Sequence, residues 1–267
     1  MKIIVTGSSS GIGQFIAQAL ARAGHEICGL ARSQDEGFGF RCDVSDWDAV
    51  QSCAEKIAAK WDAVDALICC AGIQEPIGPA MEIDPIAWRK NIAVNLDGTF
   101  FPIRALHALL KKSAGRAKVI CFSGGGATSP RANFAAYAVA KTGVVRLVET
   151  LAAEWRGEPR DINAIAPGTI FTRMTEQVLA CGESLAGAGE FSSAEKLSRD
   201  NDAKLERVLG LVEFLLSPAS DGISGRLISA PWDAWQDFPA RRAELMESDI
   251  YTLRRILPAD RGKNWEP

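Results

Sequence analysis

The stretch KIIVTGSSSGIG, residues 2–13, decides the fold of this chain. It opens on a short apolar run of strand character and leads into residues 14–23, whose apolar side chains recur at helical spacing. Gly7, Gly11 and Gly13 permit a tight turn and a close approach of the backbone to a ligand. The helix that follows offers free N–H groups and a favourable dipole to a pyrophosphate, so this unit predicts a dinucleotide-binding turn.

The rest of the chain alternates strand-like and helical segments. Strands are expected at residues 3–5, 26–30, 39–42, 66–70, 118–122, 161–165 and 226–229, and helices at residues 13–23, 47–61, 85–113, 134–155 and 205–216. Such alternation favours a parallel sheet covered by helices on both faces. No linker, internal repeat or low-complexity tract divides the sequence, so we expect one α/β domain, a doubly wound parallel sheet of Rossmann type over residues 1–267.

Two regions depart from this alternation. Residues 174–201 are rich in Ala, Gly, Ser and Glu with weak periodicity, and we expect them to form a flexible lid over the substrate. Residues 230–267 form an aromatic C-terminal tail. This tail is expected to pack over another surface, either its own or that of a neighbouring subunit.

The composition excludes several classes of protein. Apolar residues make up 47% of the chain, charged residues 24%, and the net charge of −3 indicates neither a nucleic-acid partner nor a membrane surface. Met1 leads almost directly into the first strand, which leaves no room for a signal peptide, so we expect a cytoplasmic protein. The seven cysteines form no CxxC pair and are expected to be buried free thiols, and the two histidines lie at no metal-ligand spacing, so no metal site is predicted.

Tyr137 and Lys141 form the most informative pair for chemistry. They lie four residues apart in an expected helix and therefore share one face. A cation near a phenol favours the phenolate and lowers its pKa from about 10, which suits the phenol to proton exchange with a carbonyl or alcohol oxygen. Many surface helices carry such a pair, so its meaning depends on the other motifs.

Taken together, the motifs resemble those of the short-chain dehydrogenase/reductase family in its single-domain form. The resemblance extends from about residue 2 to residue 229, and its order and spacing are more specific than any one motif. The residues that carry it are TGSSSGIG at 6–13, Asp43-Val44, Ala71-Gly72, Asn95, Tyr137 to Lys141 and Pro167-Gly168.

The resemblance implies catalytic roles. Tyr137 is the general acid/base, Lys141 lowers its pKa and binds the nicotinamide ribose, and Asn95 holds a water that links the lysine to solvent. The alternative for Asn95 is a core residue that bonds to the backbone. Thr172 resembles a residue that binds the nicotinamide amide, and its alternative is a plain helix cap.

The expected cofactor contacts follow from the same resemblance. They are Gly7, Ser9, Ser10, Gly11, Ile12, Gly13, Arg32, Ser33, Asp43, Val44, Ala71, Gly72, Tyr137, Lys141, Pro167, Gly168, Ile170 and Thr172.

The end of the second strand indicates which nicotinamide cofactor is used. A carboxylate at this position bonds the adenine ribose and repels a 2′-phosphate, but here the position appears as Ala31, followed by Arg32 and Ser33. A guanidinium pairs with a phosphate through two hydrogen bonds. We therefore favour NADP, with NAD as the alternative. Ser10 weakens this choice, because many NADP-preferring relatives carry a basic residue there.

The sequence departs from the family pattern in three places. The connection between the second and third strands, residues 33–38, is short, and the helix usual there is missing or nearly so. Cys69-Cys70 replaces two asparagines that stabilise the sheet, and thiols cannot make the same amide hydrogen bonds.

The third departure concerns the catalytic serine. Counting back from Tyr137 places this position on Gly124, whereas Ser123 is one residue early. An extra residue in the glycine run that follows would make Ser123 the catalytic serine, and this is the assignment we adopt. The alternatives are Thr128 or Ser129, or a weak catalytic site.

The sequence therefore predicts an NAD(P)-dependent oxidoreductase that transfers hydride reversibly between the cofactor and a carbonyl/alcohol substrate. Arg131, Asn133, Arg173 and Trp232 suggest a polar, partly aromatic pocket for a sugar or polyol derivative. The alternatives are reduction of an apolar ketone or acyl substrate, and a cofactor-binding regulator without turnover. The partners expected are a small-molecule substrate and further copies of the chain in a dimer or tetramer.

Overall fold

The structure is a computed structural model that describes residues 1–33 and 39–265. The described chain contains seven strands in one sheet, in the order β3-β2-β1-β4-β5-β6-β7, and every neighbouring pair is parallel. The strands are β1 (Lys2–Thr6), β2 (Glu26–Ala31), β3 (Gly39–Arg41), β4 (Ala66–Cys69), β5 (Ala117–Phe122), β6 (Arg160–Ala166) and β7 (Leu227–Ser229). The predicted doubly wound α/β fold is confirmed. The helix expected to be missing between β2 and β3 falls on residues 34–38, outside the described residues.

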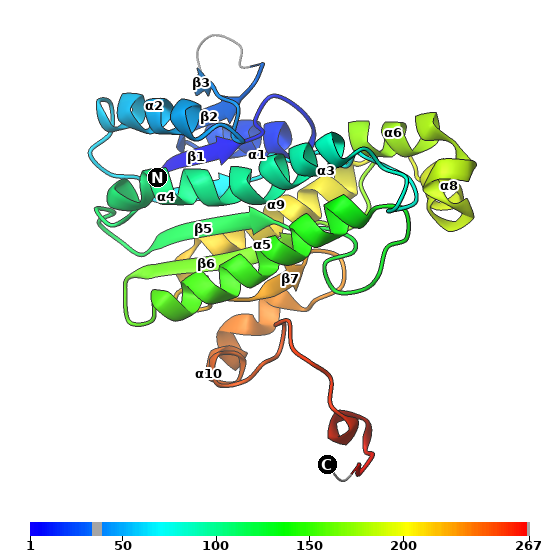
Figure 1. Ribbon diagram of the computed structural model, residues 1–267. Coiled ribbons are helices and arrows are strands. Elements are labelled where there is room, and N and C mark those ends of the chain that lie inside the picture. The colour runs from blue at the N-terminus through cyan, green and yellow to red at the C-terminus, as the bar shows by residue number, and fades with distance from the viewer. Residues whose placement is uncertain (34–38, 266–267) are drawn as a thin grey trace.

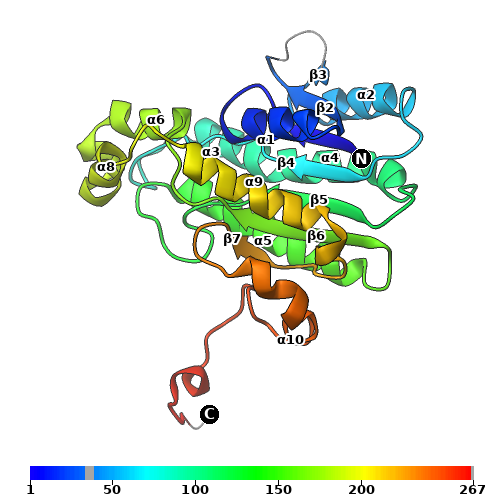
Figure 2. The same ribbon diagram turned by 180° about the vertical axis from the view of Figure 1, so that it is seen from behind.

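Helices cover both faces of the sheet. Helices α2 (Trp47–Ala58), α4 (Gly98–Leu110) and α5 (Ala135–Glu154) lie on one face (Figure 1). Helices α1 (Gly11–Arg22) and α9 (Asp202–Leu216) lie on the other (Figure 2). Side chains of β1 alternate between the two layers: Ile4 packs with the first set of helices, and Ile3 and Val5 pack with the second. The period of two along each strand thus builds two separate apolar cores.

The helix predicted over residues 85–113 is not continuous. It consists of α3 (Pro85–Ile92), a π-helical turn η1 (Ala93–Asp97) and α4. A π turn inserts one extra residue into the helical hydrogen-bond ladder and often marks a functional site. Asn95 lies within this turn.

The segment predicted as a lid folds into short helices. They are α6 (Arg173–Cys181), α7 (Glu183–Ala186) and α8 (Ala188–Glu195), and they extend from one end of the molecule (Figure 1). Val178, Ala186 and Ala194 from these helices pack around the fully buried Phe134 in a small apolar cluster of their own. At the far end of the segment, the Asn201 amide accepts from the Phe171 N–H at 3.0 Å and donates to its carbonyl at 2.6 Å. Through Phe134, which lies three residues before Tyr137, the segment thus packs on the loop that leads into α5, and through Asn201 it also contacts Phe171.

The first half of the aromatic tail packs against the domain. Trp235 and Phe238, from η3 (Trp235–Arg241), lie against Phe214 of α9, and Tyr251 lies against Phe238. Helix α10 (Arg242–Glu247) follows, and Tyr251 and Leu253 still contact the body. Beyond them the chain leaves the body and passes through the turn η4 (Pro258–Arg261) (Figures 1 and 2). Trp265, near the end of this extension, is 71% exposed.

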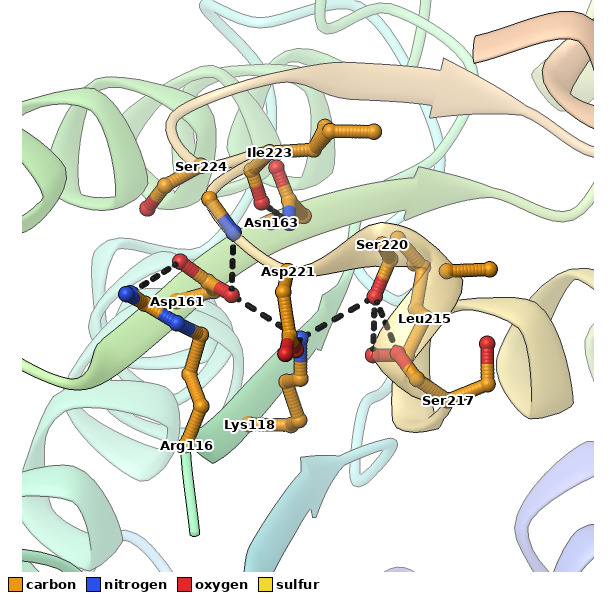
Figure 3. A network of polar contacts seen from close by, with 12 residues as sticks. Arg116, Lys118, Asp161, Asn163, Leu215, Ser217, Ser220, Asp221, Ile223 and Ser224 are labelled. Carbon is orange, nitrogen blue, oxygen red and sulfur yellow. Dashed lines mark hydrogen bonds and ion pairs between the residues drawn. The ribbon is translucent and has the colours of Figure 1, made fainter. Parts of the chain in front are cut away.

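A charge network around the buried Lys118 and Asp161 ties β5 and β6 to the turn after α9 (Figure 3). The Lys118 ammonium lies 2.9 Å from the Asp161 carboxylate and 2.7 Å from Asp221, and it donates to the Ser220 hydroxyl at 3.1 Å. Arg116 lies 3.2 Å from the other oxygen of Asp161, so the two cations and two anions balance. Lys118 and Asp161 are paired in register near the amino ends of their strands, and the network therefore stabilises the end of the sheet opposite the predicted site.

Candidate functional site

The glycine turn has no room for larger side chains. Gly7 has φ +71°, its N–H donates to the Leu30 carbonyl at 2.8 Å, and a Cβ there would lie 2.8 Å from the Ala71 backbone nitrogen. A Cβ on Gly13 would lie 2.4 Å from the Gly7 carbonyl oxygen. The turn therefore packs helix α1 directly onto the carboxyl ends of β1 and β4, as a dinucleotide-binding turn requires.

The N-terminus of α1 fits a pyrophosphate. Ser10 occupies the N-cap in an extended conformation, and no side chain of the described residues caps the helix there. The Thr6 hydroxyl is engaged elsewhere, accepting from the backbone N–H groups of Cys70 and Ala71 at 3.1 and 3.2 Å. The N–H groups of Gly11 and Ile12 thus lie in the first turn of α1, the end of the helix at which its dipole stabilises an anionic ligand.

The residues expected to hold the adenosine lie together at the ends of β2 and β3. Arg32 is exposed, and the Ser33 hydroxyl donates to the Ser9 hydroxyl at 3.3 Å. Burial raises the pKa of Asp43, but hydrogen bonds from Ser45 and the charge of Arg32 outweigh it and lower that pKa overall. Arg32 and Asp43 therefore interact electrostatically.

Val44 is buried beside them. A Cβ on Gly98 would lie 2.6 Å from a Val44 methyl, so this side chain packs against the start of α4.

Asn95 is fully buried at the centre of the π turn. Its amide nitrogen donates to the Ile73 carbonyl at 2.8 Å and to Asn91, and its carbonyl oxygen accepts from the Ile73 N–H at 3.2 Å. Asn95 thus fixes the loop after β4, which is the backbone-bonding role that the sequence left open. The same oxygen lies 2.8 Å from where a Cβ on Gly72 would stand, and the Lys141 ammonium lies 3.5 Å from that point. Gly72 therefore lets the predicted proton-relay residues approach one another.

Tyr137 and Lys141 are both buried, at 7% and 3% exposure. The Lys141 ammonium lies 5.7 Å from the centre of the Tyr137 ring and donates to the Phe122 carbonyl at 2.9 Å. Burial lowers the pKa of Lys141 to about 8. Burial also raises the pKa of Tyr137 to about 12, and the cation that opposes this rise is Arg131. The predicted lowering of the tyrosine pKa by Lys141 is therefore corrected, because desolvation of the phenolate outweighs its attraction to nearby cations.

The residue that faces the Tyr137 hydroxyl is Gly124. A Cβ on Gly124 would lie 2.4 Å from the phenol oxygen. Ser123 is buried, and its hydroxyl donates to the Lys141 carbonyl at 3.3 Å. The two alternatives, Thr128 and Ser129, are exposed. Ser123 thus lies beside the catalytic helix, one residue before the backbone that contacts the phenol, and its catalytic role stays a prediction.

The loop after β6 reaches the glycine turn. Gly168 has φ +77°, and a Cβ there would lie 2.8 Å from the Pro231 ring of the tail, so the tail backs this loop. Pro167 precedes it, and Ile170 is buried. Thr172 occupies the N-cap of α6, and its methyl group lies 3.9 Å from where a Cβ on Gly11 would stand. Thr172 is therefore both the N-cap of α6 and a neighbour of the glycine turn.

The adjacent thiols are free, and Cys69 is the last residue of β4 while Cys70 follows it. Cys69 is buried beside Cys121, its partner in register on β5, and its sulfur contacts the Thr99 carbonyl at 3.8 Å. Burial raises the pKa of Cys70 to about 12. A hydrogen bond with Cys121 and burial raise the pKa of Cys69 as well, so both cysteines are protonated near neutral pH. Cys70 is the thiol whose ionisation would act on Tyr137.

One contact was missed in the sequence. Arg131, predicted only as a pocket residue, donates from Nε and Nη2 to the two carboxylate oxygens of Glu190 on α8 at 2.8 and 2.7 Å. No local pattern joins residues 59 positions apart, so only the folded chain reveals the pair. Of the other predicted pocket residues, Arg173 and Trp232 are exposed, and Asn133 adopts φ +67°.

No group of three or more His, Cys, Asp or Glu side chains is placed to hold a metal ion within residues 1–33 and 39–265. Within the same ranges, no helix combines the length and apolar character that crossing a membrane requires.

Comparisons with known proteins agree with this arrangement. The family model described as enoyl-(acyl carrier protein) reductase matches residues 7–230. The chain is 33% identical to D-threitol dehydrogenase of Mycolicibacterium smegmatis over 64% of this chain and 70% of that protein. It is 30% identical to cis-4-hydroxycyclohexanecarboxylate dehydrogenase of Sinomonas cyclohexanicum over 85% of this chain and 93% of that protein.

A solved structure of similar fold is a short-chain dehydrogenase of Escherichia coli CFT073 complexed with NADPH. It superposes with a TM-score of 0.72 at 26% identity and covers 86% of this chain and 95% of that chain. With a family match over most of its length and the same sheet order and motifs, the chain belongs to the short-chain dehydrogenase/reductase family of NAD(P)-dependent oxidoreductases that act on CH–OH groups.

Proposed function

We propose that this protein is an NADP-preferring dehydrogenase/reductase of a sugar or polyol derivative. The observation that carries the proposal is the convergence of Lys141 and Asn95 around Gly72, with the Tyr137 ring centre 5.7 Å from the Lys141 ammonium, at the carboxyl ends of the central strands. Ligands of open α/β sheets bind at this edge. The lid segment lies against the same edge through Met174, whose methyl group is 3.6 Å from where a Cβ on Gly72 would stand.

Each side chain has a defined task in this proposal. A bound nicotinamide supplies the hydride in reduction and accepts it in oxidation. Tyr137 gives its hydroxyl proton to the substrate oxygen in reduction and takes it back in oxidation. Lys141 binds the nicotinamide ribose and, with Asn95, completes the proton relay to solvent. Ser123 holds the substrate oxygen, as the sequence assignment predicts.

The choice of NADP rests on the end of β2. Arg32 is exposed there beside Ser33, and no carboxylate stands at Ala31 to repel a 2′-phosphate. Arg32→Ala should weaken NADPH affinity by about 1.5–3 kcal/mol and leave NADH affinity little changed. The matched control is Arg22→Ala, which removes an exposed arginine from the far end of α1. Equal losses for both cofactors in titrations of Arg32→Ala would refute the phosphate contact.

The substrate class is supported by two observations. The wall beside Tyr137 carries the charged pair Arg131–Glu190, and such groups suit a substrate with several hydroxyls. One relative is named for D-threitol, a polyol. Initial rates of NADPH oxidation with keto sugars, apolar ketones and acyl thioesters, and of NADP⁺ reduction with polyols, separate the candidates. Turnover confined to the apolar ketones or acyl substrates would favour the alternative class.

The decisive test of the enzyme itself uses the two tyrosines of the chain. Tyr137→Phe keeps the ring and removes the proton, so turnover should fall by about 10²-fold or more while cofactor binding is retained. Tyr251→Phe makes the same change in the tail and should leave turnover near the wild-type value. Near-normal turnover in Tyr137→Phe would refute the assignment.

A second candidate function is a cofactor-binding regulator without turnover. It is favoured by Gly124, which presents no hydroxyl to Tyr137, and by the thiols at Cys69 and Cys70. The two functions differ in one experiment. A regulator would quench or enhance NADPH fluorescence on binding but would not consume NADPH with any member of the substrate panel.

We also propose that the protein assembles through α4 and α5. Phe100 on α4 is 39% exposed and Val139 on α5 is 51% exposed, so both helices present apolar side chains outward. A second copy of the chain would cover them, giving a dimer or a tetramer.

A further inference from the structure

Arg131 lies beside the proton donor of the proposed reaction. Its guanidinium carbon is 3.8 Å from the centre of the Phe134 ring and 5.8 Å from the centre of the Tyr137 ring. The bidentate pair with Glu190 fixes the plane of the guanidinium, and the side chain is 17% exposed. Stacking and bidentate pairing together hold the cation in one place.

Two cations thus stand at nearly the same distance from the Tyr137 ring, but they differ in the permanence of their charge. Lys141 lies 5.7 Å away, and burial lowers its pKa to about 8, so its charge is lost as the pH rises above neutral. A guanidinium remains protonated throughout the range in which proteins fold. Arg131 is therefore the constant positive charge beside the phenol.

We propose that Arg131 is a positioning residue for proton transfer: held by Glu190 and stacked on Phe134, it stabilises the phenolate of Tyr137. The proposal rests on the proposed function, because it concerns the proton donor of that reaction. Glu190 belongs to α8, so the segment predicted as a lid reaches the reacting phenol through this pair.

The charged and titratable groups that face Tyr137 in the described residues come from each packed element. They are Arg131 from the loop before α5, Lys141 from α5 itself, Cys70 from the end of β4 and, behind Arg131, Glu190 from α8. The Cys70 thiol is neutral near pH 7, because burial raises its pKa to about 12. The net field at the phenol is therefore set by the two cations and by the carboxylate that partly offsets Arg131.

The phenol can be titrated directly, without any turnover. In a Tyr251→Phe background Tyr137 is the only tyrosine, and the ultraviolet absorbance of the tyrosinate after a rapid pH jump reports its ionisation. Arg131→Met should raise the apparent pKa of Tyr137, so the tyrosinate fraction at a fixed alkaline pH should fall by up to about tenfold, the low end of the effect of one nearby charge. Arg131→Lys should restore most of the difference. Arg146→Met, which removes another ion-paired arginine, on the exposed face of α5, should change nothing.

Arg131→Met and Glu190→Gln together separate this electrostatic role from a structural one. Removing the carboxylate strengthens the field of Arg131, so the apparent pKa of Tyr137 should fall, opposite to the change in Arg131→Met. If the pair served only to seat α8, either variant would admit water to the phenol and both would lower its pKa. A fall or no change in Arg131→Met therefore overturns the proposal, and Arg131→Gln replaces that variant if it does not fold.

The rate of alcohol oxidation provides the second measurement. Oxidation requires the phenolate, so its pH profile should shift upward in Arg131→Met by the same amount as the optical titration. An optical shift without any wild-type turnover would leave the Arg131 effect standing and refute the proposed function. Normal wild-type turnover with no optical shift would refute only the role of Arg131.

Discussion

Gly124→Ala tests the placement of the reacting phenol most directly. In the structure the added Cβ would lie 2.4 Å from the Tyr137 hydroxyl oxygen, 3.1 Å from Cζ and 3.2 Å from Cε1. Ordinary contact begins at 3.4 Å, so the phenol oxygen must withdraw by about 1 Å. A displacement of this size at a reacting group costs about 10²-fold in rate. Overpacking costs about 1–3 kcal/mol of folding free energy as well.

The neighbouring glycine is the control for this variant. A Cβ on Gly125 would meet its nearest atom, Cδ of Arg131, only at 3.8 Å, which is ordinary contact. Gly125→Ala should therefore keep nearly wild-type turnover, whereas Gly124→Ala should lose about 10²-fold and melt about 2–10 °C lower. Initial rates and thermal unfolding by circular dichroism measure both effects. Wild-type turnover and melting temperature in Gly124→Ala would refute the proposed contact with Tyr137.

Four further predictions follow from the same structure. Ser123→Ala should lower turnover by about 10²–10³-fold if the Ser123 hydroxyl orients the reacting oxygen, whereas Ser129→Ala should lower it only slightly. The reverse pattern in initial rates would show that the catalytic serine was misassigned. Lys118→Met leaves the buried Asp161 carboxylate with only the partly exposed Arg116 as its cation and should cost up to about 3–5 kcal/mol in urea unfolding. Asp221→Asn, at a position 41% exposed, should cost about 1 kcal/mol or less. Light scattering should find a dimer or tetramer at micromolar concentration, and a monomer would contradict the assembly through α4 and α5. Burial lowers the pKa of Lys141 from 10.5 to about 8, so between pH 8 and pH 10.5 the unfolded chain binds more protons than the folded one. The free energy of unfolding of the wild type, relative to that of Lys141→Met, should therefore rise with pH across this window. Equal pH dependence of the two unfolding free energies would contradict the shift.

The elements of the fold were largely predictable, because periodicity is local. Every predicted strand is present, and the break in the long helix over residues 85–113 was the main difference. The break is a π-helical turn that contains Asn95. The Asn95 amide donates to the Ile73 carbonyl in the loop after β4. A helix-forming pattern does not reveal such a partner from another segment. The same holds for the segment after β6, whose helices gather around Phe134.

The sequence by itself determined the fold class and the pairing of Tyr137 with Lys141 on one helix face, because strand and helix periods and glycine turns act over a few residues. The nicotinamide cofactor was implied by the resemblance of its motifs to a family. The tertiary structure decided how those groups are tuned. Burial raises the pKa of Tyr137, Gly124 rather than a serine faces its hydroxyl, and Arg131 is held beside it by Glu190. These properties depend on desolvation and on distances between segments far apart in the chain, which only the folded structure fixes.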